Sequence, residues 1–196
     1  MFHLSISIFI DASIERPLMT LNIRQSSELD ANDDTVNSHV TLINAVYQEV
    51  EGDMWKPDNS GRTYAGEVEN FLQNKELLIA EIDGKIVGSI KIEHIDDNTL
   101  AFGMLVVDPD VRGKGIGREL VNSAEANARD NGYTVMQLEL LTPRHWENTS
   151  KEFLKTWYTR IGYKPNKTRS FEEVSPHRMD EFATDCDFTI WLKDLT

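Results

Sequence analysis

The stretch from Leu105 to Asn131 constrains the fold of this chain most, because a strand, a glycine-rich loop and an amphipathic helix follow one another in it directly. The apolar strand stops at Asp108-Pro109, since proline fixes φ and has no N–H to donate. Glycine adopts backbone conformations that a Cβ forbids, and alternate glycines come next: Gly113, Gly115 and Gly117. The sequence therefore predicts a strand that leads through a tight loop into a helix.

A stripe of apolar residues at helical spacing predicts this helix and its buried face. The residues on that face are Ile116, Leu120, Val121, Ala124 and Ala128. The opposite, polar face is assigned Arg118, Glu119, Asn122, Glu125 and Arg129. Asn131-Gly132 ends the helix, with glycine in its usual position after the last turn.

The start of this helix is predicted to bind an anion. The first N–H groups of a helix have no intrahelical partner, and the helix dipole places partial positive charge there. Arg112, Lys114 and Arg118 add full positive charges, although the whole chain has a net charge of −13. A phosphate group is therefore the expected ligand. The alternative is a glycine-rich turn before an ordinary helix.

Two common phosphate-binding motifs do not fit the loop. A Walker A motif needs Ser or Thr after Gly-Lys, and a dinucleotide motif needs glycine at the position of Leu120. The residues instead match R-x-x-G-x-G, with Arg112, Gly115 and Gly117 behind a strand that ends in V-D-P. This pattern resembles the coenzyme A pyrophosphate loop of the GNAT-type N-acetyltransferase superfamily. The resemblance is strongest over residues 77–163.

The order of elements predicts a mixed α/β fold in one domain over residues 21–196, after an extension or edge strand at residues 1–20. Further strands are predicted at residues 21–24, 77–82, 85–95, 99–107, 134–141 and 186–192, and further helices at 37–47, 67–74 and 149–161. The helix at 149–161 is assigned a capping box, Thr149-x-x-Glu152, and an apolar face made of Phe153, Leu154, Trp157, Tyr158 and Ile161. Another strand starts at Tyr163, and residues 164–185 are expected to be irregular.

The strand–helix–strand unit around the glycine loop predicts a ligand site. Such a unit crosses over right-handed and joins parallel strands, and ligands bind where strands part. The resemblance implies a GNAT-like central sheet, mixed but mostly antiparallel, of about six to seven strands flanked by helices. The one parallel crossover would lie at the cofactor site.

The resemblance also implies the co-substrate, acetyl-CoA, and residues that hold it. These are Leu105, Val106, Val107, Arg112, Gly113, Lys114, Gly115, Ile116, Gly117 and Arg118. No metal is expected, because no His, Cys or acidic spacing in the chain resembles a metal site.

Tyr158 to Tyr163 reads Y-x-x-x-G-Y, which resembles the helix ending of GNAT enzymes in which the tyrosine lies near the thioester sulfur. The resemblance implies that Tyr158 protonates the departing thiolate, since a phenol keeps its proton at neutral pH. A backbone N–H near Leu105 would hold the carbonyl oxygen. On residue type alone, Tyr158 could equally be a core residue of its helix.

The sequence leaves open which group deprotonates the amine. The resemblance implies a glutamate two residues before the glycine of the strand at 99–107, but that position is Ala101. Glu93 is the candidate base, and Glu139 is another option. Because Glu93 and His94 are neighbours on a strand, they point to opposite faces and at most one of them faces the cleft.

The loop Glu49–Arg62 is the candidate for contacts with the acceptor, and a solvated loop with one packed tryptophan is the alternative. His145 could form a polar lid, or it is simply a surface residue. Cys186 is the only cysteine, so the chain has no intramolecular disulfide, and we expect it to be a buried strand residue.

Composition limits the partners of the protein. A sequence pI of about 4.8 argues against a nucleic-acid surface, which needs a basic face. The acidic charge suits a cationic acceptor, and solubility is the simpler explanation. The apolar residues 1–10 lack a cationic n-region and are too few to span a bilayer, so we expect no membrane and a cytoplasmic location.

The leading hypothesis is an N-acetyltransferase that moves an acetyl group from acetyl-CoA to a primary amine by direct attack. The acceptor would be a small-molecule amine or a peptide or lysine amine, and a homodimer is possible. The alternatives are a non-catalytic, regulatory module that binds coenzyme A and a scaffold protein whose loop binds no cofactor.

Overall fold

The computed structural model describes residues 20–58 and 61–196, so the predicted extension or edge strand at residues 1–20 lies outside the described residues except for Thr20. Within this part of the chain, one seven-stranded sheet has the order β1-β2-β3-β4-β5-β7-β6. Its strands are β1 (Leu21–Gln25), β2 (Leu77–Ile82), β3 (Lys85–Asp96), β4 (Thr99–Val107), β5 (Val135–Pro143), β6 (Lys164–Ser170) and β7 (Cys186–Asp194). Among them, β4 and β5 alone run parallel. The predicted mixed, mostly antiparallel sheet is therefore confirmed.

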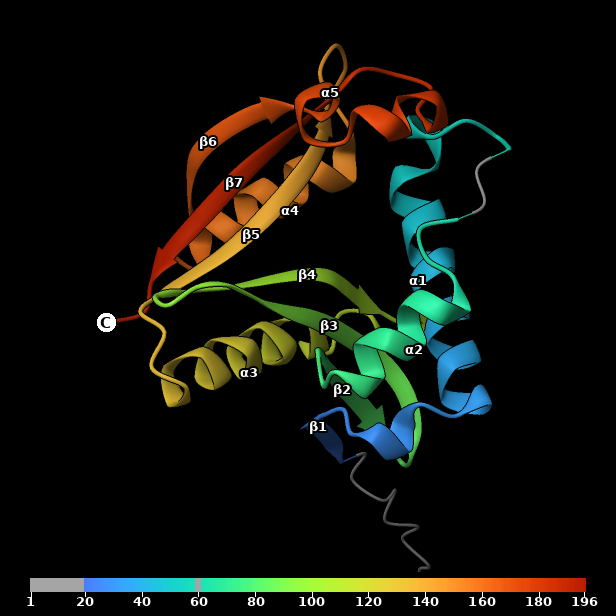
Figure 1. The fold of residues 1–196 in the computed structure, drawn as a ribbon, viewed down its shortest axis with the longest axis vertical. Coiled ribbons are helices and arrows are strands. Elements are labelled where there is room, and N and C mark those ends of the chain that lie inside the picture. The colour runs from blue at the N-terminus through green and yellow to red at the C-terminus, as the bar shows by residue number, and fades with distance from the viewer. Residues whose placement is uncertain (1–19, 59–60) are drawn as a thin grey trace, which may run out of the picture.

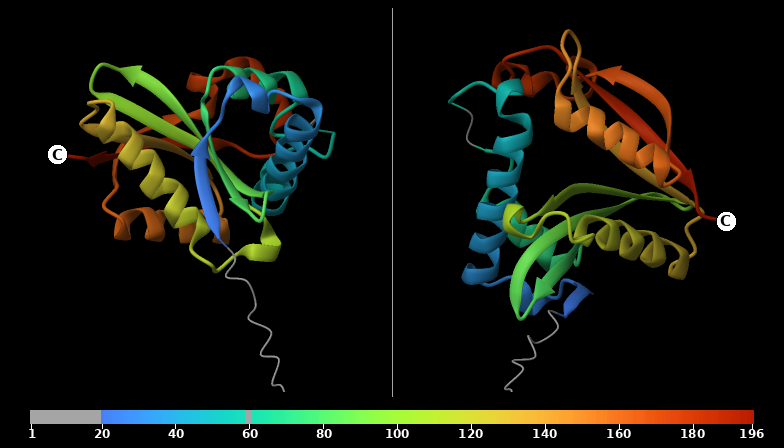
Figure 2. Two further views of the ribbon diagram at one scale, coloured as in Figure 1. Left: turned by 90° about the horizontal axis from the view of Figure 1, so that it is seen from below. Right: turned by 180° about the vertical axis from the view of Figure 1, so that it is seen from behind.

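Helices cover both faces of this sheet (Figures 1 and 2). Helix α1 (Asp33–Glu51) and helix α2 (Ala65–Gln73) pack on one face, and helix α3 (Ile116–Asp130) packs on the other. Helix α4 (Thr149–Arg160) lies against β5, and a short helix α5 (Phe171–Val174) follows β6. Short 3-10 helices lie at Glu28–Asp30, Gly52–Met54, Pro109–Val111 and Pro176–Glu181.

The strand β2, which lies between β1 and β3, shows why both faces are covered. Leu78 and Ala80 pack in the cluster of α3, whereas Leu77 and Ile79 pack in the cluster of α1 and α2. A strand buried on both sides is continuously apolar instead of alternating. The sheet therefore separates two hydrophobic cores along its first half.

Local sequence signals placed most of these elements correctly. Asp83 and Gly84 have φ of 51° and 77°, as a two-residue hairpin turn requires. The five apolar residues of the predicted α3 stripe are all buried. Gly132 follows α3 with φ of 85°, the left-handed conformation that favours glycine after a helix.

Glu125 was placed on the polar face of α3, and this was wrong. Its side chain is buried, accepts a hydrogen bond from Tyr163 Oη at 2.9 Å, and forms an ion pair with Lys193 Nζ at 2.7 Å. A buried carboxylate is tolerated when it is paired in this way. These partners, Tyr163 after α4 and Lys193 on β7, are far from α3 in sequence, so the helical periodicity of α3 could not predict them.

Two predictions about α4 were also wrong. Its N-cap is Asn148, whose side chain accepts a hydrogen bond from the backbone N–H of Lys151 at 3.1 Å, so Thr149 does not form a capping box. Glu152 instead pairs with Lys155. Phe153, expected on the apolar face, is 66% exposed. The N-cap therefore lies one residue before the predicted one, and the Phe153 side chain faces away from the sheet.

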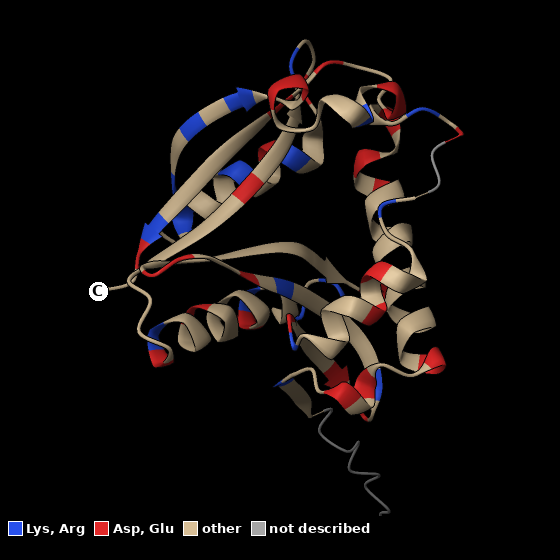
Figure 3. Ribbon diagram, viewed as in Figure 1, with Lys and Arg blue, Asp and Glu red and all other residues tan. Residues whose placement is uncertain are grey.

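Residues 164–185 were expected to be irregular, but β6 occupies the first seven of them. This edge strand pairs with β7, yet most of its side chains are exposed, so it shows no hydrophobic alternation. In Figure 3 the positions of basic residues are blue along β6, and these residues are Lys164, Lys167 and Arg169. Charges of this kind protect an edge strand from pairing with another chain.

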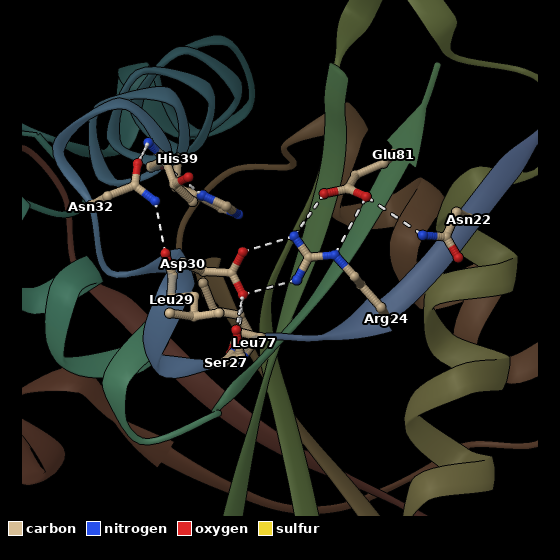
Figure 4. Close-up of polar contacts among 11 residues, drawn as sticks. Asn22, Arg24, Ser27, Leu29, Asp30, Asn32, His39, Leu77 and Glu81 are labelled. Atoms are coloured by element: carbon tan, nitrogen blue, oxygen red, sulfur yellow. Dashed lines mark hydrogen bonds and ion pairs between the residues drawn. The ribbon is translucent and has the colours of Figure 1, made fainter. Parts of the chain in front are cut away.

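His39 is a buried histidine at the first half of α1 (Figure 4). Its Nδ1 lies 2.9 Å from the Thr35 carbonyl oxygen, which can only accept, so Nδ1 carries the proton. Its Nε2 is buried without a hydrogen-bond partner among the described residues. Burial lowers the pKa of His39, although Asp30 lies close enough to oppose the shift. Arg24 holds that carboxylate and Glu81 in the same network.

We expect the stability of the protein to fall as the pH drops below about 6.5, because the unfolded chain protonates His39 and the folded chain resists it. The slope should approach roughly 1.4 kcal/mol per pH unit. Urea unfolding between pH 7 and pH 5.5 measures it, and His39→Gln, which keeps a donor for Thr35, should flatten the slope. An unchanged slope in that variant would contradict the assignment. Asp30, whose pKa Arg24 lowers to about 2, titrates in a separate, more acidic window.

Candidate functional site

The loop between β4 and α3 forms an open backbone cradle. Gly113 and Gly115 have φ of 80° and 81°, a region that side chains with a Cβ rarely adopt, and Gly115 is the N-cap of α3. A Cβ at either position would meet no atom within 4 Å, and one on Gly117 would lie 3.7 Å from Val107 Cγ2. The protein itself therefore leaves room for a ligand against these glycines.

The positive charges of this loop are not equivalent. Arg112 donates two hydrogen bonds to the Glu49 carboxylate on α1, at 2.5 Å and 2.7 Å. Lys114 and Arg118 form no ion pair within the described part of the chain. The sequence alone did not distinguish the three cations, but in the structure Glu49 on α1 neutralises the charge of Arg112. Lys114 and Arg118 are thus the charges that an anion at the helix start can meet.

β4 and β5 separate halfway along their length. They pair from Thr99↔Val135 to Phe102↔Leu138 and no further. Figure 1 shows the two strands diverging from this paired end, with α1 standing across the open side. The predicted parallel pair and its splayed end are confirmed.

A bulge in β4 lies at the point of separation. On β4 the register with β3 passes from Gly103↔Lys91 to Val106↔Ser89, and Met104 has a φ of 48°. Because a bulge inserts an extra residue, it reverses which side chains face which side of the sheet. Phe102 packs in the α3 core, but Met104 packs with α1 and α2. Simple alternation along the sequence could not show this reversal.

A cleft of about 450 Å³ opens where the strands part. Its walls come from β3, β4, β5, α1 and α4. Several residues singled out in the sequence line it: Glu93, Ala101, Leu105, Glu139 and Tyr158. The structure therefore brings these residues together. The side chain of Val106 is buried in the core with α1 and α2 instead.

Tyr158 lies in an aromatic cluster at the wall of this cleft. Its ring centroid is 5.0 Å from that of Trp157, 5.8 Å from that of Tyr163 and 6.0 Å from that of Phe102. Burial raises the pKa of Tyr158 above its ordinary value. Its hydroxyl makes no hydrogen bond to a described residue. The phenol is thus both protonated at neutral pH and unengaged.

The candidate base Glu93 is engaged in an ion pair. Lys91 Nζ lies 2.8 Å from its carboxylate and 3.7 Å from that of Glu76, and the ammonium also lies 4.7 Å from the centre of the Phe71 ring. His94 turns the other way, where its Nδ1 lies 3.0 Å from Tyr133 Oη. Glu93 and His94 therefore face opposite sides of the sheet, as expected.

A buried ion pair that the sequence did not reveal closes one side of the cleft. Glu51 at the end of α1 binds Lys151 in the first turn of α4, and their side chains are 3% and 6% exposed. Trp55 Nε1 donates to the same carboxylate at 3.2 Å. Asn148 Nδ2 donates to the carbonyl oxygen of Val50 at 3.0 Å. These contacts join α1 to α4, and no local pattern marks partners so far apart in sequence.

The loop expected to contact the acceptor does border the cleft. Trp55 and Arg62 of this loop line it, and both also line a second, adjoining hollow of about 520 Å³ together with Tyr47 of α1. Trp146 lines only the second hollow, whereas the neighbouring His145 pairs with Asp185 at 3.2 Å. These positions agree with a surface role for His145.

The described residues give little support to a cysteine nucleophile, a metal site or a membrane-spanning helix. Cys186 is buried, and desolvation raises the pKa of its thiol to about 12, so it is a poor nucleophile. Among these residues, no group of three His, Cys, Asp or Glu is placed to hold a metal ion. No described helix is long and apolar enough to cross a membrane.

Comparison with known proteins gives a consistent result. A family model described as an acetyltransferase (GNAT) domain matches residues 73–165. An uncharacterised N-acetyltransferase from Methanocaldococcus jannaschii is 30% identical over 91 residues, which cover 43% of this chain and 37% of that protein. The chain spans less than two thirds of the length of the curated relatives it matches.

Solved structures share the fold at low sequence identity. An aminoglycoside 6′-N-acetyltransferase in complex with coenzyme A has a TM-score of 0.65 and 18% identity, and the match covers 89% of this chain and 97% of that one. An N-acetyltransferase from Staphylococcus aureus has a TM-score of 0.63 and 16% identity, with 90% and 99% covered. At this identity the likeness concerns the fold.

Proposed function

Because the chain belongs to the GNAT acetyltransferase superfamily, we propose that it is an acetyl-CoA-dependent N-acetyltransferase that acts on a primary amine. One observation carries the proposal: β4 lines the cleft where it parts from β5 and leads on into the glycine cradle at the start of α3. The cradle suits a pyrophosphate, and the cleft holds a buried, unengaged phenol where an acyl group could react.

The residues of the cradle fit coenzyme A. The backbone N–H groups from Gly113 to Arg118 would bind the pyrophosphate, with the charges of Lys114 and Arg118 beside them. Leu105 to Val107 lie on β4 beyond its pairing with β5, so this edge is available to the pantetheine arm. When bound, acetyl-CoA supplies a thioester carbon that an amine can attack.

The residues of the cleft would then have distinct roles. The backbone N–H of Leu105, at the bulge, would donate to the carbonyl oxygen as charge develops there. Tyr158 would give its phenolic proton to the sulfur as the carbon–sulfur bond breaks. Glu93 lines the cleft as the candidate base, and its carboxylate pairs with Lys91 Nζ at 2.8 Å.

A panel of amines with acetyl-CoA, followed by release of free thiol, tests the proposed activity. The panel should include small amines, polyamines and peptides with free α-amino or lysine amines. Turnover on any of them supports an enzyme. The second candidate, a non-catalytic module that binds coenzyme A, is favoured by Ala101 at the position where a base was expected. Tight binding of acetyl-CoA without turnover on any amine would select it. The cytoplasmic location and the homodimer that we expect from the sequence remain predictions about this protein.

We expect Gly117→Ala to weaken acetyl-CoA binding at least tenfold, about 1.4 kcal/mol, because the new Cβ stands where the ligand meets the backbone. The protein itself tolerates this Cβ, which would lie at an ordinary contact distance from Val107. Lys114→Ala should have a smaller effect. Titration calorimetry measures the affinities.

Gly66→Ala is the matched control, since Gly66 also lies in the first turn of a helix and has an ordinary φ. It should bind acetyl-CoA as the wild type does. Gly115→Ala is a poorer probe, because its positive φ would strain the fold itself. If a folded Gly117→Ala protein binds acetyl-CoA as tightly as the wild type, the glycine cradle is not part of the cofactor site.

A further inference from the structure

Arg62, in the loop between α1 and α2, brings a full positive charge to the cleft. It lines both the cleft at the parted strands and the adjoining hollow. Its guanidinium carbon lies 5.2 Å from the centre of the Tyr47 ring on α1. Desolvation of its phenol raises the pKa of Tyr47 to about 12, so this ring is neutral at pH 7 and cannot balance the charge of Arg62. An arginine stacked on an aromatic ring still has N–H groups with which to bind an anion.

The backbone beside Arg62 is fixed to α1. The N–H of Thr63 donates to Asn44 Oδ1 at 3.0 Å, and Asn44 Nδ2 donates to the carbonyl oxygen of Thr63 at 3.0 Å. Thr63 is buried, and its Oγ1 donates to Glu67 at 2.6 Å. Because the residue next to Arg62 is held in this way, the arginine extends from a defined position and loses less freedom when it binds a ligand.

Arg62 differs from the other cations of the cleft in its charge balance. In the part of the chain that the structure describes, no carboxylate forms an ion pair with Arg62. The other lysines and arginines that line the cleft each have a carboxylate partner: Lys91 has Glu93, Lys151 has Glu51, and Arg178 has Glu181. Arg62 is therefore the cation of this cleft that can meet the negative charge of a ligand.

Arg178 provides a close comparison. Its guanidinium carbon lies 5.4 Å from the centre of the Trp55 ring, so it also stacks on an aromatic side chain at the cleft. It donates two hydrogen bonds to the carboxylate of Glu181, at 3.0 Å and 2.7 Å. The protein itself thus supplies Arg178 with the carboxylate that Arg62 lacks.

The geometry and charge of Arg62 select a carboxylate as this anion. A guanidinium presents its N–H groups as a fork that fits two oxygens of one group. One unbalanced positive charge matches a carboxylate, whereas a phosphate monoester carries about −1.5 to −2 at pH 7. Glu67 and Glu93 also line the cleft and would repel the larger negative charge more strongly.

We propose that Arg62 binds a carboxylate of the acceptor, so that the protein acetylates amines that also carry a carboxylate, such as free amino acids. This inference rests on the proposed acetyltransferase function. The carboxylate would lie beside Tyr47 and Arg62, with the amine toward Leu105 and Tyr158, which line the same cleft. Arg62 would touch no reacting atom, so its loss should weaken binding of the acceptor and leave the chemical step almost intact.

Matched pairs of acceptors test the proposal. Each L-amino acid is compared with its α-carboxamide, which keeps the amine and the side chain but removes the negative charge. β-Alanine and γ-aminobutyrate sample longer separations between amine and carboxylate. In the wild type we expect kcat/KM for the best carboxylate acceptor to be at least about tenfold higher than for its amide.

Arg62→Met should abolish this preference. We expect KM for the best carboxylate acceptor to rise at least about tenfold, kcat to stay within about threefold of wild type, and the ratio of acid to amide to fall below about threefold. Arg62→Lys keeps the charge without the fork, so it should keep part of the preference. Arg178→Met is the matched control and should keep the wild-type ratio, because Arg178 is already paired.

The outcomes separate this inference from the proposed function. If the wild type binds acetyl-CoA but acetylates no amine, the proposed function is contradicted and the inference with it. If it acetylates only amines without a carboxylate, or prefers an amine phosphate ester, the enzyme stands and the carboxylate site is wrong. A wild-type ratio in Arg62→Met, or an equal loss of the ratio in Arg178→Met, also overturns the site. Melting temperature and acetyl-CoA affinity equal to wild type show that Arg62→Met is folded, and Arg62→Lys repeats the test with a smaller change.

Discussion

Tyr158→Phe is expected to lose about a hundredfold in kcat while acetyl-CoA affinity and melting temperature barely change. The hydroxyl of Tyr158 makes no hydrogen bond to a described residue, so phenylalanine should preserve the packing against Trp157 and Phe102. A general acid acts mainly in the transition state, and its loss therefore appears in turnover. Steady-state kinetics with an amine found by the screen measures the effect.

Tyr163→Phe is the matched control for this variant. Tyr163 belongs to the same aromatic cluster, but its hydroxyl donates to the buried carboxylate of Glu125. Removing that donor should lower the melting temperature and leave kcat nearly unchanged, the reverse of the pattern for Tyr158. If kcat of Tyr158→Phe stays within twofold of wild type, with chemistry rate-limiting, Tyr158 is a core residue and not the acid.

Lys151→Met should destabilise the protein by about 3–5 kcal/mol, because it leaves the carboxylate of Glu51 buried without its cation. That is a large share of the roughly 5–15 kcal/mol that stabilises a folded domain. The contact also joins the end of α1 to the first turn of α4, the helix that carries Tyr158. The midpoint of urea unfolding measures the loss.

Lys155→Met on the same helix provides the control. Lys155 also pairs with a glutamate, Glu152, but these side chains are 38% and 45% exposed. An exposed pair contributes little, so this change should stay within about 0.5 kcal/mol of wild type. The double variant Glu51→Gln with Lys151→Met should recover most of the lost stability, since no buried charge then lacks a partner. A single Lys151→Met protein within 1 kcal/mol of wild type would contradict the assignment.

The elements around the glycine loop could be predicted from the sequence because their signals are local. Apolar periodicity marked the buried face of α3, Asp83-Gly84 marked the hairpin, and Asp108-Pro109 marked the end of β4. The parallel crossover followed from the handedness that all such units share. These elements therefore predict both the fold class and the splayed cleft.

Local sequence patterns gave wrong predictions where the surroundings of a residue come from distant segments of the chain. Glu125 is polar by type, yet residues far along the chain bury and pair it. β6 has no apolar alternation, because its hydrogen bonds with β7 define it as a strand. Asn148 and Thr149 are both common cap residues, and only the fold shows that the side chain of Asn148 accepts the hydrogen bond from the Lys151 N–H.

The sequence by itself determined the order of the elements, the glycine cradle at the start of α3 and the presence of Tyr158 near the end of α4. Tertiary structure alone decided which charged groups of the cleft are engaged: Arg112 by Glu49, Glu93 by Lys91 and Glu51 by Lys151. It also decided that β4 and β5 part after Phe102↔Leu138 and open a cleft there. The physical reason is that periodicity and turn chemistry act between near neighbours in the chain, whereas the state of a charge depends on what the folded chain places within a few ångströms of it.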